Sequence, residues 1–440
     1  MYICYTRIGM VDWLCKAFEA YAKKSILVMI NDEKQDGTMI ERLLEYKAFV
    51  GRIVVEAFTP TTPSSVPQAA PGSPNPFNVA VRVAFTAALA TRGRRPSELL
   101  AKYLDAEMRK GQQGSSDLEF RKKVDAAIGL YGFLSEHDVF RTYSLRLLGK
   151  RLLLQRSASD DFEKAFLKKL EADVDSEFEK GLKMFEDIEL SRTQLADYHA
   201  THPSQSFFSA YVLQESAWQK PPASAMPAAN FTLPPVLQDP LDEFVRFYAQ
   251  RQPKRKLTWA PGFGSVTLLT RFDKGEKALS LSLWQALVML LFEDVDKLTF
   301  ADIRAAVEIV DLDELKRTVQ SLALGRRRVL TKRPQTVEVL DSDEFIFNRA
   351  FEDKSRNVRI NTIQAQESPE ERQAIEKEVD AFREGTVDAG IVRIMKGAKN
   401  LSHQELLIRT IEVVKRHFDL QPQYFKARVE SLLDREYIAR

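Results

Sequence analysis

Cysteine is scarce in this sequence of 440 residues, which contains only Cys4 and Cys15. Two cysteines near one end cannot build a disulfide framework, and they offer little support for a cysteine-based zinc site. This scarcity is typical of a reducing compartment, so the sequence predicts the cytoplasm and nucleus. His199 and His202 lie close together, but without further ligands at suitable spacing we expect no metal there.

Long apolar runs are also missing. No stretch of about 18 apolar residues occurs, so no membrane-spanning helix is predicted. The opening residues, MYICYTRIGM, lack the apolar core and cleavage site of a signal peptide. A helical pattern begins almost at once, which favours a chain shortened at its N-terminus or an incomplete gene model.

Net charge is nearly absent, with 64 Lys and Arg against 62 Asp and Glu. A net charge of +2 provides no global field to attract nucleic acid, so nucleic-acid binding is not expected. The local clusters Lys254–Lys256 and Arg326–Arg328 are interpreted as solvated turns. A winged-helix DNA-binding protein remains the alternative that such clusters leave open.

Recognisable catalytic motifs are lacking. The glycines at 262–264 are not followed by the Gly-Lys of a phosphate-binding loop, and no G-x-S-x-G nucleophile motif occurs. Asp160 and Asp161 suit the first turn of a helix better than acid–base catalysis. The sequence therefore predicts a non-catalytic scaffold that needs no cofactor.

The composition is that of a soluble globular protein, with 44% hydrophobic and 29% charged residues, and the length predicts two to four domains. Two Pro-rich stretches divide it. Thr59–Pro76 is predicted to be an inserted loop and Trp218–Pro235 an extended connection. Between them, helices are predicted from Glu98, with Ser97 as the N-cap, and over Asp117–Phe133, His137–Gln155 and Ser159–Asp187, where Ser159 is the cap. Together they form a helical bundle.

The hydrophobic period changes after about residue 206. Strands are predicted at 207–214, 265–272 and 277–284, with a hairpin turn at Asp273–Glu276. Three helical segments and two further strands then follow, an order typical of a winged helix. The order begins again with helices at Gly390–Gly397, Ser402–Phe418 and 423–435, where Ser402 and Glu405 have capping-box spacing. Arg440 then ends the chain before any wing strand.

The predicted fold is therefore mainly α with α/β: a helical bundle, then an α/β region with a winged helix, then a C-terminal winged helix. At this point the sequence resembles the cullin family. GIVRIMKGAKNLSH (390–403) and ARVESLLDREYIAR (427–440) resemble the end of a cullin, and Ile391–Lys396 resembles the signature around the family's modified lysine. The other matching segments are GKRLLLQRSASDDFEKAFLKKL (149–170), FVRFYAQRQPKRKLTW (244–259), TVQSLALGRRRVL (318–330) and FIFN (345–348).

The resemblance covers roughly residues 10–440 and is closest in pattern to the cullin-4 subtype, on SLALGRRRVL and KMFEDIELS (183–191). It implies four domains. Residues 1–50 would end the last cullin repeat, 51–205 would be the helical bundle with the Pro-rich insert 59–76, 206–366 the α/β cullin homology region, and 367–440 a C-terminal winged-helix (neddylation) domain with a truncated wing. Ser144 and Leu147 depart from the family's usual Tyr and Asp.

The resemblance also implies a function. The chain would be the scaffold of a cullin-RING ubiquitin ligase. An Rbx-type RING protein would add a strand near Tyr211, Val212 and Leu213, and would hold a ubiquitin-conjugating enzyme. The neddylation modifier would be attached by its own conjugating enzyme to Lys396, within the context of Ile391, Val392, Arg393, Ile394 and Met395. Substrate-adaptor binding would be mostly lost with the missing N-terminal repeats.

Lys396 has two competing interpretations. By itself it would be an ordinary solvated helix lysine, and Lys399, expected on roughly the same helix face, is the alternative acceptor. Residues 391–440 carry ten Lys or Arg and six Asp or Glu, a surface that could attract an acidic conjugating enzyme. An unmodified cullin-homology subunit of an anaphase-promoting-type complex is the other alternative within the family.

Overall fold

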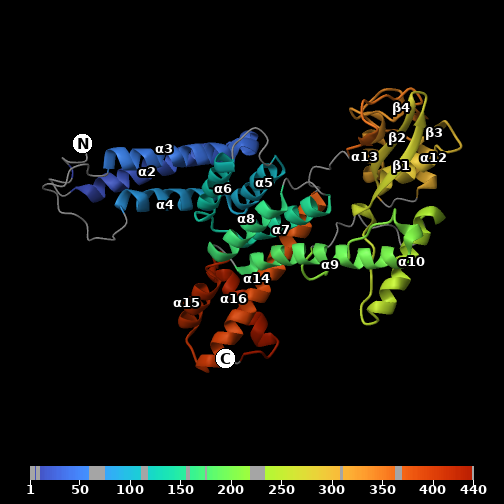
Figure 1. Ribbon diagram of the computed structural model, residues 1–440. Helices are drawn as coiled ribbons and strands as arrows, with labels where there is room; N and C mark the ends of the chain where they lie inside the picture. The colour runs from blue at the N-terminus through green and yellow to red at the C-terminus, as the bar shows by residue number, and fades with distance from the viewer. Residues whose placement is uncertain are drawn as a thin grey trace. The chain divides into compact units, whose positions relative to one another are not determined.

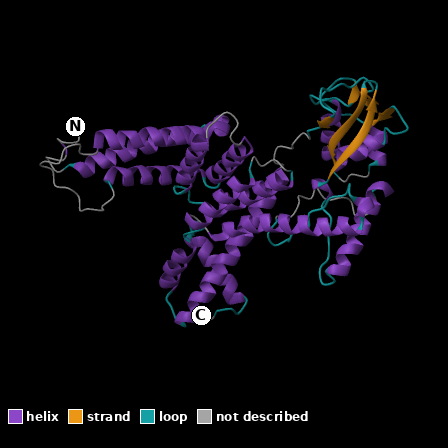
Figure 2. Cartoon of the chain, in the orientation of Figure 1, coloured by secondary structure: helices purple, strands orange, loops and turns teal. Residues whose placement is uncertain are grey.

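The computed structural model describes residue 5 and residues 10–58, 75–110, 117–154, 159–173, 176–218, 233–307, 311–361 and 369–438. The described residues are mostly helical, and the strands among them lie between residues 265 and 359 (Figure 1 and Figure 2). It forms two compact units, Met1–Lys183 with Gln373–Arg440, and Met184–Arg372. Most of both Pro-rich stretches lies outside the described residues. No described helix is long and apolar enough to cross a membrane.

The first unit begins with three helices, α2 (Val11–Ile30), α3 (Met39–Phe58) and α4 (Pro76–Leu89). Helix α4 starts as its sequence indicates, because the Asn75 side chain accepts the Phe77 N–H at 2.9 Å and proline occupies the first turn. The rings of Phe58 and Phe77 stack at 4.1 Å, which closes the α3–α4 end of the core.

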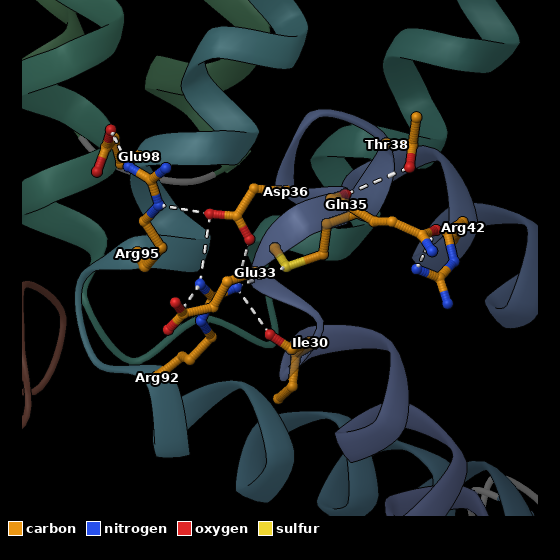
Figure 3. A network of polar contacts seen from close by, with 10 residues as sticks. Ile30, Glu33, Gln35, Asp36, Thr38, Arg42, Arg92, Arg95 and Glu98 are labelled. Atoms are coloured by element: carbon orange, nitrogen blue, oxygen red, sulfur yellow. Dashed lines mark hydrogen bonds and ion pairs between the residues drawn. The ribbon is translucent and has the colours of Figure 1, made fainter. Parts of the chain in front are cut away.

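A polar network joins these helices to the bundle (Figure 3). Asp36 lies in the short 3₁₀ helix η1 (Glu33–Thr38), and its carboxylate accepts Arg92 at 2.6 Å and Arg95 at 2.9 Å. Arg92 also donates to the Ile30 carbonyl at 2.7 Å, and Arg95 to Glu98 at 2.6 Å. The turn between α2 and α3 is thereby tied to the start of α5.

The bundle contains α5 (Arg95–Lys110), α6 (Asp117–Tyr131), α7 (His137–Leu153) and α8 (Asp160–Asp173), with η2 (Ala90–Arg92) before it. Helix α5 begins at Arg95, so the predicted N-cap role of Ser97 is wrong. Ser97 is buried inside the first turn, where Arg95 already pairs with Asp36 and Glu98. Ser159 does cap α8, accepting the Phe162 N–H at 3.4 Å.

The single helix predicted over 159–187 is two helices. Helix α8 ends at Asp173, and after η3 (Ser176–Phe178) helix α9 (Glu179–Thr201) begins. At Gly181, a Cβ would lie 2.9 Å from a methyl of Leu167 and 3.2 Å from Leu148. A Cβ at this position would therefore force these leucine side chains to shift where α9 packs on α8 and α7.

The second unit holds a small sheet in the order β1-β2-β6, preceded by η4 (Pro203–Gln205), α10 (Pro235–Arg251) and η6 (Pro261–Phe263). The predicted hairpin is confirmed: β1 (Ser265–Phe272) pairs antiparallel with β2 (Gly275–Ser282). The turn needs Gly275, whose φ is +115°. Strand β6 (Asn357–Arg359) runs parallel to β2.

The central winged helix is also confirmed. It comprises α11 (Leu283–Leu290), α12 (Phe300–Ala306), α13 (Leu312–Ala323) and the sheet β3-β5-β4, formed by Lys297–Thr299, Glu344–Phe347 and Leu330–Arg333. Ser282 and Thr299 each begin a helix through a capping box. Lys332 and Asp343 form a fully buried ion pair at 2.7 Å.

The first unit is completed by α14 (Pro369–Ala398), α15 (His403–Val414) and α16 (Pro422–Asp434). The capping box of Ser402 and Glu405 is confirmed. The helix predicted from Gly390 in fact begins at Pro369 and is thirty residues long. Its second half packs into the terminal core, whose buried members are Val387, Ile391, Leu406, Val414, Phe418, Leu420, Phe425 and Leu432.

Candidate modification site and partner-binding segment

Lys396 lies in the last turn of α14, with its side chain exposed. The residues before it fix this placement. Ile391 is fully buried in the terminal core, and Val392, Ile394 and Met395 pack against that core while half-buried. Arg393 is exposed, like Lys396 three residues later. The apolar members of the hexapeptide thus anchor the helix, and its two cations face solvent.

The Lys396 amine has no hydrogen-bond or ion-pair partner among the residues that the structure describes. An acceptor lysine must be reachable and must lose a proton before it attacks a thioester. Exposure meets the first requirement. No carboxylate among the described residues contacts the amine.

Lys399 does not share the helix face of Lys396, contrary to the prediction. Helix α14 ends at Ala398, and Lys399 has a left-handed backbone with φ of +62°. Its N–H donates to the Met395 carbonyl at 2.8 Å, which closes the helix C-terminus. The chain therefore turns at Lys399, which places the two lysines in different local settings.

The second candidate site is the segment 207–214, which contains Tyr211, Val212 and Leu213. The prediction of a strand over 207–214 is wrong, because none of these residues forms a strand or pairs with one in the described chain. Side chains of α9 bind its backbone instead. The Ser191 hydroxyl bonds both the N–H and the carbonyl of Val212, each at 2.8 Å.

Two further α9 side chains extend this contact. Asp187 accepts the Gln214 N–H at 3.0 Å, and the His199 Nε2–H donates to the Phe208 carbonyl at 2.8 Å. All the backbone groups held in this way belong to even-numbered residues. Among the described residues, no backbone hydrogen bond is made by the N–H or carbonyl groups of Ser209 and Leu213.

The side chains of the segment alternate in the same way. Phe207, Ser209 and Tyr211 are exposed, whereas Ala210 is buried, and Val212 and Leu213 are half-buried. Val212 packs against an aromatic cluster built around the fully buried Tyr198, whose other members are Ala210, Phe244, Phe247, Tyr248, Leu195, Phe208, Leu257 and Trp259. One face of the segment is therefore fixed by the cluster, and α9 holds its even-numbered backbone groups.

Sequence reasoning missed the residues that hold this segment. Asp187, Ser191 and His199 are spaced so that they lie along one side of α9, and Asp187 and Ser191 are buried. Polar residues on the buried side of a helix need hydrogen-bond partners, so their spacing indicates that another segment packs there. His199 is engaged by a carbonyl, consistent with a structural role.

Three segments of the chain match cullin domains. Residues 1–195 match the cullin alpha solenoid domain, 212–351 the cullin alpha+beta domain, and 382–440 the cullin protein neddylation domain. The chain belongs to the cullin family, as the sequence resemblance predicted. The mainly α architecture with an α/β region is likewise confirmed. The four predicted domain boundaries stay predictions.

The relatives include several cullins of the fourth subtype and also Cullin-3A of Arabidopsis thaliana. Cullin-4A of Mus musculus and Cullin-4A of Homo sapiens are each 34% identical over 448 residues, covering 100% of this chain and 56% of the relative. Cullin-4 of Schizosaccharomyces pombe is 30% identical over 423 residues, covering 94% of this chain and 55% of the relative. The chain thus spans about half the length of the curated relatives it matches.

Proposed function

We propose that the chain is a non-catalytic scaffold of a cullin-RING ubiquitin ligase, acting in the cytoplasm and nucleus and modified at Lys396. The observation that carries the proposal is the exposed Lys396 amine, without a partner among the described residues, at the end of a helix in a segment that matches the neddylation domain. Its anchoring by Ile391 gives the lysine a fixed place on the surface.

The test is a conjugation assay with purified neddylation enzymes. The wild-type chain should accept one modifier, and Lys396→Arg should abolish the product, because arginine keeps the charge but cannot form the isopeptide bond. Lys399→Arg is the matched control and should react like wild type. Equal modification of wild type and Lys396→Arg would refute the assignment.

The segment 207–214 supports the RING-binding part of the proposal. No described residue bonds the outward backbone groups of Ser209 or Leu213, so a partner strand could pair there by β-augmentation. The aromatic cluster beneath Val212 would hold the segment 207–214 in place, so that the partner strand pairs with it in one register. The bound RING would hold a ubiquitin-conjugating enzyme near a substrate lysine and act by proximity.

Proline substitution tests this pairing. Ser209→Pro removes an outward N–H donor yet fits an extended backbone, whereas Ser209→Ala keeps the donor. Losing one backbone hydrogen bond costs about 1 kcal/mol, so Ser209→Pro should weaken capture of an Rbx-type RING protein roughly fivefold. Ser209→Ala should bind like wild type. Identical capture by both variants would exclude strand pairing at this residue.

A further inference from the structure

The terminal domain meets the bundle at the first turn of α7. The backbone N–H groups of His137 and Asp138 both donate to the His417 carbonyl at 3.1 Å. Such N-terminal donors need a cap, and Glu136, at the capping position, provides no side-chain cap. Glu136 also forms an antiparallel bridge with Phe418. A carbonyl from the far end of the chain therefore completes α7.

Arg383 of α14 reinforces this contact. Its Nε donates to one Asp138 carboxylate oxygen at 2.6 Å and its Nη2 to the other at 2.8 Å, and Nη2 also bonds Glu136. The Arg383 side chain is 12% exposed and that of Asp138 is 1% exposed. A bidentate, nearly dry pair of this kind is strong and directional. The guanidinium also lies 4.6 Å from the Phe418 ring centre.

The electrostatics keep Arg383 charged. Burial lowers the pKa of Arg383, but the carboxylates of Asp138 and Glu136 raise it by more, so the net shift is upward. Two neighbouring contacts follow the same interface. The Arg141 guanidinium lies 4.4 Å from the Phe382 ring centre, and Arg94 pairs with Asp380 at 2.5 Å.

We infer that Arg383, Asp138, Glu136 and the His417 carbonyl form a latch, here called the α7 latch, that fixes the orientation in which Lys396 is presented. Helix α14 runs without interruption from Arg383 to Lys396, a step of about 20 Å. A rigid rod of this length transmits any tilt at the latch to the acceptor amine. The inference rests on the proposed modification of Lys396.

The latch affects both the rate of modification and the choice of the lysine that is modified. Lys415 and Lys426 are also exposed on the terminal domain, on α15's end and on α16. While the latch is closed, the domain offers one orientation to a conjugating enzyme held by the RING partner, and transfer depends on that orientation. When it opens, the domain turns and the other lysines compete. Arg383 is thus a positioning residue.

Arg383→Gln tests the inference in the full chain bound to its RING partner. Modification of Lys396 should slow about tenfold, and products at Lys415 and Lys426 should appear by peptide mass spectrometry. Arg383→Lys should give intermediate behaviour, because it keeps one charged contact. The control is Arg428→Gln, which breaks the pairs with Asp388 at 2.6 Å and with Glu384 at 3.2 Å but removes none of the contacts made by Arg383, Asp138, Glu136 or the His417 carbonyl.

Wild-type rate and site selectivity in Arg383→Gln would overturn the positioning role. The latch can also be tested in unmodified protein, by a measurement that does not depend on Lys396. Hydrogen exchange of the His137 and Asp138 amides should quicken at least about tenfold in Arg383→Gln but not in Arg428→Gln. Equal exchange in both variants would overturn the latch itself. A wild-type chain that takes no modifier at Lys396 would instead refute the proposed function, and the exchange result would still judge the latch.

Discussion

Arg151 is the residue whose replacement should most clearly destabilise the bundle. Its guanidinium donates to both oxygens of Glu163, at 2.7 and 2.8 Å, and to Asp105 at 2.5 Å. The three side chains come from α7, α8 and α5 and are 6%, 1% and 5% exposed. Burial lowers the pKa of Arg151, but Glu163 and Asp105 raise it by more, so the arginine stays charged.

Arg151→Met would remove the guanidinium that bonds both carboxylate oxygens of the buried Glu163. Removing one member of a buried ion pair costs about 3–5 kcal/mol, mainly because the remaining charge is desolvated and uncompensated. Asp105 would keep a charged partner in this variant, because Arg109 also forms an ion pair with it. Replacing Glu163 as well, in Arg151→Met/Glu163→Met, should recover most of the loss, because an apolar pair needs no compensation.

The assay is hydrogen exchange of the amides in α7 and α8, read as a local opening free energy. Arg151→Met should accelerate exchange by about two to three and a half powers of ten. The control is Lys169→Met. It breaks the Lys169–Asp125 pair at 2.6 Å, in which both side chains are about half exposed, and should cost less than about 1 kcal/mol. An Arg151→Met effect as small as the control's, or a double variant no better than the single, would refute the reasoning.

Three further predictions concern packing, capping and pH. Gly181→Ala should lower the stability of the first unit by about 1–3 kcal/mol in thermal unfolding, because the added methyl meets leucine side chains. Ser402→Ala should cost about 1 kcal/mol and speed exchange in the first turn of α15. Burial raises the pKa of Asp343, but the Leu340 N–H and the Lys332 amine lower it by more, so the net shift is downward. The ionised Asp343 should therefore stabilise the central winged helix above about pH 4, and this contribution should be lost on further acidification. The measurement is the urea midpoint of unfolding as a function of pH, whose fall below about pH 4 should be smaller in Asp343→Asn.

Local signals predicted the local structure well. Ser159, Ser402 and the hairpin glycine Gly275 act where the sequence placed them, because a cap or a positive φ depends on a few neighbouring residues. The start of α5 escaped prediction because it depends on Asp36, which is distant in sequence but bonded to Arg95. Tertiary contacts of this kind override propensity.

The same distinction between local signals and tertiary contacts applies to the candidate sites. The helix predicted over Gly390–Gly397 lies within α14, where the structure shows Ile391 anchored in the terminal core and Lys396 exposed. The pattern at 207–214 predicted a strand, but pairing is a property of two strands and no described strand lies beside it. Arg383 and Asp138 gave no local signal, since their meeting depends on the fold.

Helix α14 explains why a contact on α7 matters to a lysine at the other end of the terminal domain. Gly385 and Gly390 weaken its intrinsic helicity by about 1 kcal/mol each relative to alanine, and both lie between the latch and Lys396. The helix is therefore held by packing on both sides of them: Val379 is buried before the latch and Ile391 in the terminal core. Because these glycines weaken the stretch between the latch and Lys396, loosening the latch should loosen that stretch as well as change its tilt. The presentation of Lys396 consequently depends on the bundle and the terminal core together.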